Sequence, residues 1–218
     1  MTERPDPEKF IAVMTKIPRV PLPPNDIRPD IRTERLLLRA LRQDDLQDLH
    51  ILCQQEGVMK WTALGRTNVN LGETQERLSQ FLPPNDTKTL KYAICLGETG
   101  EFIGIGGCSE LQGLFGWPDI GYMFKQEAWG KGYATEFVRA FLEIYSGLPR
   151  EQTEIRVDPR SVAGEGAVVE ERYLAIVLEG NEKSQKILTK CGFEYFLTFQ
   201  GRRGVITTFR YFPGRKPS

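Results

Sequence analysis

The sequence predicts a mixed α/β fold in which helices cover both faces of a sheet. Short apolar stretches with alternating polarity recur along the chain, as expected of half-buried strands. From residue 134 onward apolar residues recur at a spacing of three and four, which is typical of a helix buried along one face. The chain has 218 residues, 40% hydrophobic and 27% charged, and such a chain can bury the core of a single enzyme-sized domain.

The same patterns predict the order of the elements. Before the central helix they predict a strand at 32–40, helices at 43–55 and 72–82, and strands near 88–96, 101–111 and 118–125. After it they predict a strand near 172–179, a helix at 182–190 and closing strands near 193–200 and 204–212. The run Gly104-Ile105-Gly106-Gly107 resembles part of a dinucleotide fingerprint, but no helix follows it, so these glycines are interpreted as strand or bulge positions.

The chain divides into an N-terminal arm at 1–30, a main domain at 31–213 and a short tail at 214–218. Half of the 14 prolines occur by residue 29, which rules out a continuous helix or sheet in the arm. A short helix at 7–16 is expected there, either packed on its own domain or in contact with a second copy. Residues 151–171 are acidic and lack a period, so an inserted loop is expected, serving either as a substrate lid or as an exposed insertion without function. Ile155-Arg156-Val157 could form a brief strand in it.

The net charge and the first residues of the chain give no sign of a nucleic-acid or membrane partner. With 29 basic and 29 acidic residues the formal net charge is zero, so no basic surplus favours nucleic acid and no local patch favours a membrane. The first residues lack the apolar core of a signal peptide, and no apolar run is long enough to span a bilayer. We therefore expect a cytoplasmic protein, a monomer or homodimer, with no nucleic-acid or membrane partner.

Cysteine and histidine do not follow the spacing of a metal site. The four cysteines are scattered, and the one histidine, His50, is three residues from Cys53 on a predicted helix. These two residues either form a two-ligand site or pack in the helix, and packing is the expected role. No metal is expected, and the thiols should be reduced and mostly buried.

The segment Trp129-Gly130-Lys131-Gly132-Tyr133-Ala134-Thr135-Glu136 places a glycine-spaced turn directly before the central helix. The first amides of a helix lack intrahelical partners, and the helix dipole adds partial positive charge, so a phosphate or pyrophosphate can bind there. Glycine at 130 and 132 lets the backbone approach such a ligand, and Lys131 either adds a charge or is solvated. A glycine turn without a ligand is the alternative, because this pattern alone is weak.

Three segments, in the correct order, resemble the GNAT acetyltransferases. The stretch from Gly121 to Glu136 is similar to their acetyl-CoA-binding motif, in the form found in ribosomal-protein N-terminal acetyltransferases. Thr33-Glu34-Arg35-Leu36-Leu37-Leu38-Arg39 resembles their first strand, and Asn181-Glu182-Lys183-Ser184 with Lys190-Cys191-Gly192-Phe193 resembles the segment near the pantetheine. The resemblance spans about residues 31 to 212 and implies a central, mostly antiparallel sheet of six to seven strands.

The resemblance also implies the residues that bind acetyl-CoA as cosubstrate. Asn181 would contact the pantetheine arm in addition to capping the helix that follows it. A backbone amide around Met123 or Phe124 would stabilise the thioester oxygen. The expected cofactor-binding set is Met123, Phe124, Trp129, Gly130, Lys131, Gly132, Tyr133, Ala134, Thr135, Asn181 and Ser184.

Transfer of an acetyl group to an amine also requires a base and a proton donor. Asp119 stands where relatives often carry a glutamate that acts through water, and Glu110 is the second choice. Either carboxylate could instead be a solvated strand residue. Many family members use a tyrosine to protonate the thiolate, but this chain has Leu188 there, so the role would fall to Ser184.

These residues predict an N-acetyltransferase that transfers the acetyl group directly from acetyl-CoA to an amine. The acceptor is either a protein N-terminus or a small-molecule amine such as a polyamine, an amino sugar or a drug. The alternative from another class is a module that binds acyl-CoA, or serves as a scaffold, without turnover.

Overall fold

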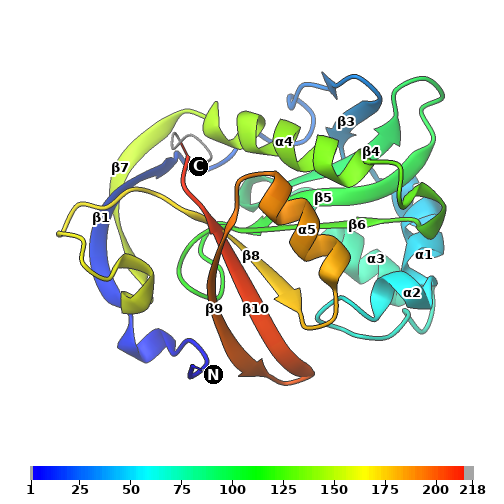
Figure 1. The fold of residues 1–218 in the computed structure, drawn as a ribbon. Helices are drawn as coiled ribbons and strands as arrows, with labels where there is room; N and C mark the ends of the chain where they lie inside the picture. The colour runs from blue at the N-terminus through cyan, green and yellow to red at the C-terminus, as the bar shows by residue number, and fades with distance from the viewer. Residues whose placement is uncertain (1, 214–218) are drawn as a thin grey trace. The chain divides into compact units, whose positions relative to one another are not determined.

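The computed structural model describes residues 2 to 213, so the predicted tail at 214–218 lies outside the described residues. The chain divides into two compact units. Figure 1 labels most of their helices and strands. Among the described residues the first unit comprises 2–19, 110–120 and 142–213, and the second comprises Val20–Ser109 and Gly121–Phe141. Each unit has a hydrophobic cluster of its own.

The second unit contains the strands β2 to β5, most of β6 and the first part of the long helix α4. Its strand order is β2-β3-β4-β5-β6, and the first three neighbouring pairs are antiparallel. The bounds are β2 Ile31–Arg32, β3 Leu36–Ala40, η2 Gln43–Asp45, α1 Leu46–Cys53, α2 Glu56–Met59, α3 Leu71–Ser79, η3 Asp86–Lys88, β4 Leu90–Leu96, β5 Phe102–Glu110, β6 Asp119–Phe124, η4 Gln126–Ala128 and α4 Tyr133–Ser146.

Glycines of β5 allow close packing in the second unit. A Cβ atom on Gly106 would lie 2.4 Å from the ring of Phe137 on α4, and one on Gly104 would lie 2.3 Å from the carbonyl oxygen of Met123 on β6. Real Cβ atoms do not approach other atoms so closely, so only glycine fits at these positions. The interpretation of residues 104 to 107 as strand positions is confirmed.

The first unit contains an antiparallel sheet and a separate two-stranded ribbon. Strands β8, β10 and β9 lie side by side in that order, and Asp119 of β6 pairs in parallel with Leu174 of β8. The ribbon pairs β1 with β7. The bounds are η1 Pro7–Lys9, β1 Ile11–Pro18, β7 Arg150–Val157, η5 Pro159–Val162, β8 Tyr173–Leu178, α5 Glu182–Lys190, β9 Glu194–Gly201 and β10 Gly204–Tyr211.

The fold class is confirmed: the sheet is mostly antiparallel and helices accompany it. Among the described residues the sheet has eight strands, more than the six to seven expected. The extra strand is β2, a two-residue segment that pairs with β3. The predicted division into an arm at 1–30 and a domain at 31–213 stays a prediction.

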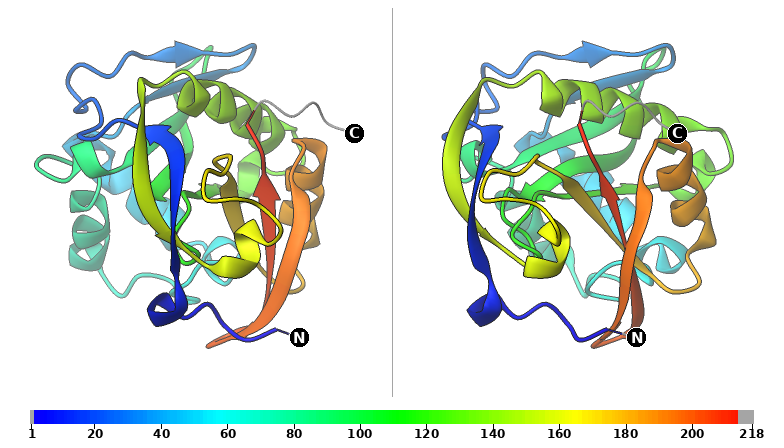
Figure 2. Two further views of the ribbon diagram at one scale, coloured as in Figure 1. Left: turned by 90° about the vertical axis from the view of Figure 1, so that its left-hand side faces the viewer. Right: turned by 60° about the vertical axis from the view of Figure 1, so that its left-hand side comes forward.

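The helix expected at residues 7–16 is wrong. Only Pro7–Lys9 forms a helical turn, and Ile11–Pro18 forms strand β1 beside β7 (Figure 2). Val13 and Ile17 point into the hydrophobic cluster of the first unit while Ala12 and Lys16 are exposed, which is the period of two of a strand. The arm therefore packs on its own chain through β1.

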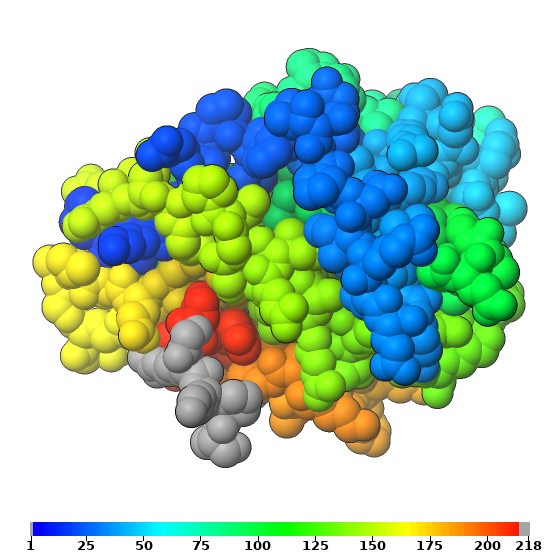
Figure 3. Space-filling view, turned by 90° about the horizontal axis from the view of Figure 1, so that it is seen from above, coloured from blue at the N-terminus to red at the C-terminus, as the bar shows by residue number. Residues whose placement is uncertain are grey.

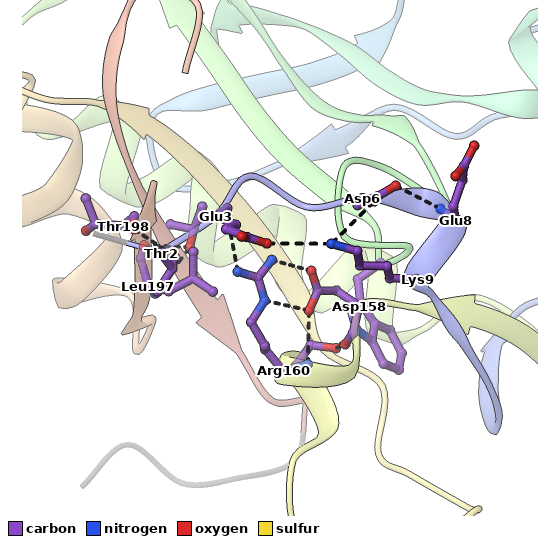
Figure 4. A network of polar contacts seen from close by, with 12 residues as sticks. Thr2, Glu3, Asp6, Glu8, Lys9, Asp158, Arg160, Leu197 and Thr198 are labelled. Atoms are coloured by element: carbon purple, nitrogen blue, oxygen red, sulfur yellow. Dashed lines mark hydrogen bonds and ion pairs between the residues drawn. The ribbon is translucent and has the colours of Figure 1, made fainter. Parts of the chain in front are cut away.

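Polar contacts hold the start of the arm (Figure 4). Arg160 donates to the carboxylate of Asp158 and, 2.8 Å away, to the carbonyl oxygen of Glu3. The ammonium of Lys9 lies 3.6 Å from the carboxylate of Glu3, and the amide of Thr2 donates to the carbonyl oxygen of Thr198 at 2.9 Å. These contacts lie within the first unit and add to the pairing of β1 with β7.

The loop expected at 151–171 is wrong for its first third, because Arg150–Val157 forms strand β7. The brief strand considered at 155–157 is the end of this longer strand. The remainder is fixed by Arg172, which is fully buried between the rings of Trp117 and Phe212 and forms an ion pair with Glu165. A paired, stacked arginine fixes a segment that has no regular period.

Candidate functional site

The predicted glycine turn is present at the start of α4, while its binding of a phosphate stays a prediction. The φ angles are +75° at Gly130 and +84° at Gly132, a left-handed conformation that favours glycine. The amides of Thr135 and Glu136 both donate to the carbonyl oxygen of Gly132, at 3.1 and 3.2 Å. Helical hydrogen bonding thus begins there, and the preceding amides of the first turn remain for a ligand.

The surroundings of the turn suit an anion. Gly130, Lys131 and Gly132 are exposed, and a Cβ atom on Gly130 would meet no atom within 4 Å. A Cβ atom on Gly132 would lie 3.3 Å from Nη2 of Arg35. The turn therefore combines accessible backbone with a guanidinium, which are the groups that bind phosphates in proteins.

The side chain of Trp129 is used within the protein. Its indole nitrogen donates to the carbonyl oxygen of Phe124 at 2.9 Å, and its ring packs on the hydrophobic cluster of the second unit, as does Met123. Trp129 thus ties the turn to the end of β6. Any contact that Trp129, Met123 or Phe124 makes with a ligand stays a prediction.

An ion pair that sequence reasoning missed lies beside the turn. Glu136, in the first turn of α4, accepts a hydrogen bond from Nε of Arg35 at 2.8 Å and one from the hydroxyl of Thr33 at 2.5 Å. Burial raises the pKa of Glu136, but the hydrogen bonds from Thr33 and Arg35 outweigh burial, and the pKa is below its usual value. Figure 3 shows the segment around residue 35, in blue, against the start of α4, in yellow-green.

Asp119, the predicted base, begins β6 in the first unit. Its Oδ2 accepts a hydrogen bond from the amide of Leu114 at 3.1 Å, and its Oδ1 is buried without a hydrogen-bond partner among the described residues. Burial raises the pKa of Asp119 to about 7, and the negative charge of Glu110 adds to this, against the opposing effect of the Leu114 amide. A carboxyl group whose pKa is near neutrality can both accept and release a proton at physiological pH.

Gly113 allows the burial of the Asp119 carboxylate, and this role was not predicted from the sequence. A Cβ atom there would lie 2.1 Å from Oδ2 of Asp119, so only glycine lets the loop after β5 close over the carboxylate. Glu110, the second choice of base, is the last residue of β5 and is exposed. Its exposure makes Glu110 the more strongly solvated of the two carboxylates.

Asn181 caps α5 as predicted. Its side-chain oxygen accepts a hydrogen bond from the amide of Ser184 at 3.3 Å. Leu188, in the position where many relatives have tyrosine, is buried with 1% of its surface exposed. Asn181 and Ser184 lie in the first unit with Asp119 and Glu110, while the turn and β6 from Gly121 onward lie in the second.

The four cysteines are buried free thiols, and Cys53 belongs to the hydrophobic cluster of the second unit, so its packing role is confirmed. His50 is hydrogen-bonded to the hydroxyl of Thr74 at 2.7 Å. Within residues 2–213 no three histidine, cysteine, aspartate or glutamate side chains form a group that could hold a metal ion. In the same part of the chain, no helix is long and apolar enough to cross a membrane.

Comparison with known proteins identifies the class. The model of the acetyltransferase (GNAT) domain matches residues 35–194, which is more than half of the chain, and the chain therefore belongs to the GNAT acetyltransferase family. The expectation from the three motifs is confirmed.

Individual relatives agree with this class. The chain is 29% identical over 135 residues to an uncharacterized N-acetyltransferase, p20, of Bacillus licheniformis, covering 59% of this chain and 73% of the relative. Two solved structures share the fold at low identity. A spermidine N-acetyltransferase from Vibrio cholerae, in complex with CoA and spermine, has a TM-score of 0.60 at 16% identity, covering 83% of this chain and 96% of that one. RimL, a ribosomal L7/L12 alpha-N-protein acetyltransferase in complex with coenzyme A, has a TM-score of 0.62 at 14% identity, covering 84% and 98%.

Proposed function

We propose that the protein is an acetyl-CoA-dependent N-acetyltransferase that transfers the acetyl group directly to an amine. The observation that carries this proposal is the exposed glycine turn before α4, where two left-handed glycines leave helix amides accessible next to Arg35. Membership of the GNAT family supports acyl transfer. Acetyl-CoA would supply a thioester whose carbonyl carbon the amine attacks.

In this reaction Asp119 removes the proton that the attacking amine must lose. An α-amino group has a pKa of about 7.7 to 8.0 and a lysine amine about 10.4, so a base is needed near neutral pH. The raised pKa of Asp119, about 7, is well matched to that role. Glu110 is the second choice of base.

The negative charges that form on the thioester oxygen and on the departing thiolate also need hydrogen-bond donors. A backbone amide at Met123 or Phe124 would stabilise the negative charge that forms on the thioester oxygen. That charge forms as the amine makes the new carbon–nitrogen bond, and it returns to the carbonyl as the carbon–sulfur bond breaks. The hydroxyl of Ser184 would donate a proton to the departing thiolate. Asn181 would hold the pantetheine arm. We further propose Trp129, Lys131, Tyr133, Ala134 and Thr135 as contacts of the cofactor phosphates.

The acceptor is proposed to be either a protein N-terminus or a small-molecule amine. The names of similar structures, a spermidine N-acetyltransferase and a ribosomal-protein acetyltransferase, support testing both classes. The second candidate function is binding of acyl-CoA without turnover. The buried Leu188 favours that candidate, because it replaces the usual tyrosine acid.

Two measurements test the proposal. Titration calorimetry should show binding of acetyl-CoA, and CoA should compete with it for the same site. If acetyl-CoA neither binds nor raises the melting temperature, the proposed function is wrong. A cytoplasmic location, a monomeric or homodimeric state and the absence of nucleic-acid or membrane partners stay predictions.

A further inference from the structure

We propose that Arg35, in the connection between β2 and β3, is a positioning residue of the phosphate-binding turn. The inference rests on the proposed binding of acetyl-CoA at that turn. It assigns a role to the Thr33-Glu34-Arg35 segment, which resembles the family's first strand but takes no part in the proposed acetyl transfer. All residues involved belong to the second unit.

Glu136 and Arg35 form an ion pair in which both carboxylate oxygens accept hydrogen bonds. The guanidinium reaches Oε2 of Glu136 through both Nε and Nη2, at 2.8 and 2.7 Å. The backbone amide of Arg35 and the hydroxyl of Thr33 donate to Oε1, at 2.8 and 2.5 Å. Four donors thus hold one carboxylate, on a side chain that is only 14% exposed, and they fix the β2–β3 connection on the first turn of α4.

Arg35 also contacts the turn itself. Its Nη1 donates to the carbonyl oxygen of Lys131 at 2.9 Å, and the centre of the guanidinium lies 5.0 Å from the centroid of the Tyr133 ring. In a trans peptide the carbonyl and the following amide point in opposite directions. Because the carbonyl of Lys131 faces Arg35, the amide of Gly132 faces away from it, toward a ligand.

The charge of Glu136 also favours this role for Arg35. A carboxylate in the first turn of a helix competes with a bound anion for the same amides and the same positive dipole. The pKa of Glu136 lies below its usual value, so this carboxylate is ionised at neutral pH. Arg35 balances the charge of Glu136, and its side chain, 45% exposed, lies beside the turn. Without Arg35, cofactor phosphates would approach an unpaired negative charge.

The test is the dissociation constant of acetyl-CoA for variants, measured by titration calorimetry. Arg35→Ala should weaken binding about tenfold or more, the range expected for loss of charge-assisted hydrogen bonds. The affinity of Arg35→Lys should lie between those of the wild type and Arg35→Ala, because lysine keeps the charge but cannot contact both Glu136 and Lys131. The loss should be similar for 3′-phosphoadenosine 5′-diphosphate, which carries phosphates but no pantetheine.

A double variant separates positioning from simple loss of stability. Glu136→Gln in the Arg35→Ala protein removes the unpaired carboxylate and should recover part of the affinity. A matched control is Arg210→Ala, since Arg210 also forms an ion pair, with Glu194 at 2.7 Å, and lies over the ring of Phe196. This control should bind acetyl-CoA as the wild type does.

The outcomes are distinct. Unchanged affinity in folded Arg35→Ala, or no recovery in the double variant, overturns the role of Arg35 while leaving the proposed function intact. If Arg35→Ala fails to fold, unchanged affinity in Arg35→Lys overturns it instead. Failure of the wild type to bind acetyl-CoA overturns the proposed function itself.

Discussion

The buried carboxylate of Asp119 predicts an unusual dependence of stability on pH. Its pKa is raised from 3.8 to about 7 in the folded protein, mainly by burial. A raised pKa means that the folded state binds the proton more tightly than the unfolded state. The resulting stability is fully present below about pH 4 and is lost as the pH rises through about 7.

The magnitude follows from the two pKa values. One pKa unit corresponds to about 1.36 kcal/mol, so Asp119 alone lowers the free energy of unfolding by about 2.5 kcal/mol between about pH 5 and about pH 8. For a chain of this length that loss is roughly 5 to 10 °C in melting temperature. Asp119→Asn cannot titrate and should lack this loss, whatever its stability at one pH.

Melting temperatures of both proteins across this pH range provide the assay, because titrating groups that do not interact with Asp119 contribute equally to both. The difference between Asp119→Asn and the wild type should grow in favour of the variant as the pH rises. Glu98→Gln, which removes an exposed carboxylate in the turn after β4, should follow the wild type. Parallel pH curves for Asp119→Asn and the wild type would refute a carboxyl group that titrates near 7.

Three further predictions concern activity and packing. The value of kcat/KM should rise with pH through about 7, the pKa of Asp119. Asp119→Asn should lower kcat and leave the affinity for acetyl-CoA unchanged. Equal kcat for the variant and the wild type in initial-rate assays would show that Asp119 is not the base. Gly132→Val should weaken acetyl-CoA binding in calorimetry, because φ is +84° at residue 132. The control Gly166→Ala should bind as the wild type does, because a Cβ atom there meets no other atom within 4 Å. Equal affinities of Gly132→Val and the wild type would contradict the proposed turn geometry. Gly106→Ala should cost about 1–3 kcal/mol in urea unfolding, because its Cβ would lie 2.4 Å from the Phe137 ring, and an unchanged midpoint would contradict this packing.

The sequence predicted those elements whose signal is local. The period of α4, the positions of the central strands and the asparagine cap of α5 each have a signal within a few residues, and all three were confirmed. The alternation expected of half-buried strands was wrong for β4 and β5, which are buried almost throughout. Strand β1 was missed because its partner β7 is distant in the chain, with Ile11 opposite Val157. Prolines on both sides of β1 also favoured an irregular arm.

The site shows the same division between local and distant signals. The glycine turn could be predicted because both glycines and the helix that follows are contiguous. The pairing of Arg35 with Glu136 joins residues 101 positions apart, and the approach of Gly113 to Asp119 depends on the shape of a loop. The available signal was Glu136, a carboxylate in the first turn of the helix that was predicted to bind an anion, since its charge would oppose that anion unless a cation balanced it.

The central claim is that this GNAT family member transfers the acetyl group of acetyl-CoA to an amine. Mass spectrometry of peptides with free N-termini, polyamines and amino sugars, each incubated with acetyl-CoA and the protein, tests that claim most directly. We predict that at least one amine gains an acetyl group and that an equal amount of CoA is released. Binding of acetyl-CoA with no acetylated product and no CoA above background across the whole set would contradict the claim and favour a non-catalytic binding module.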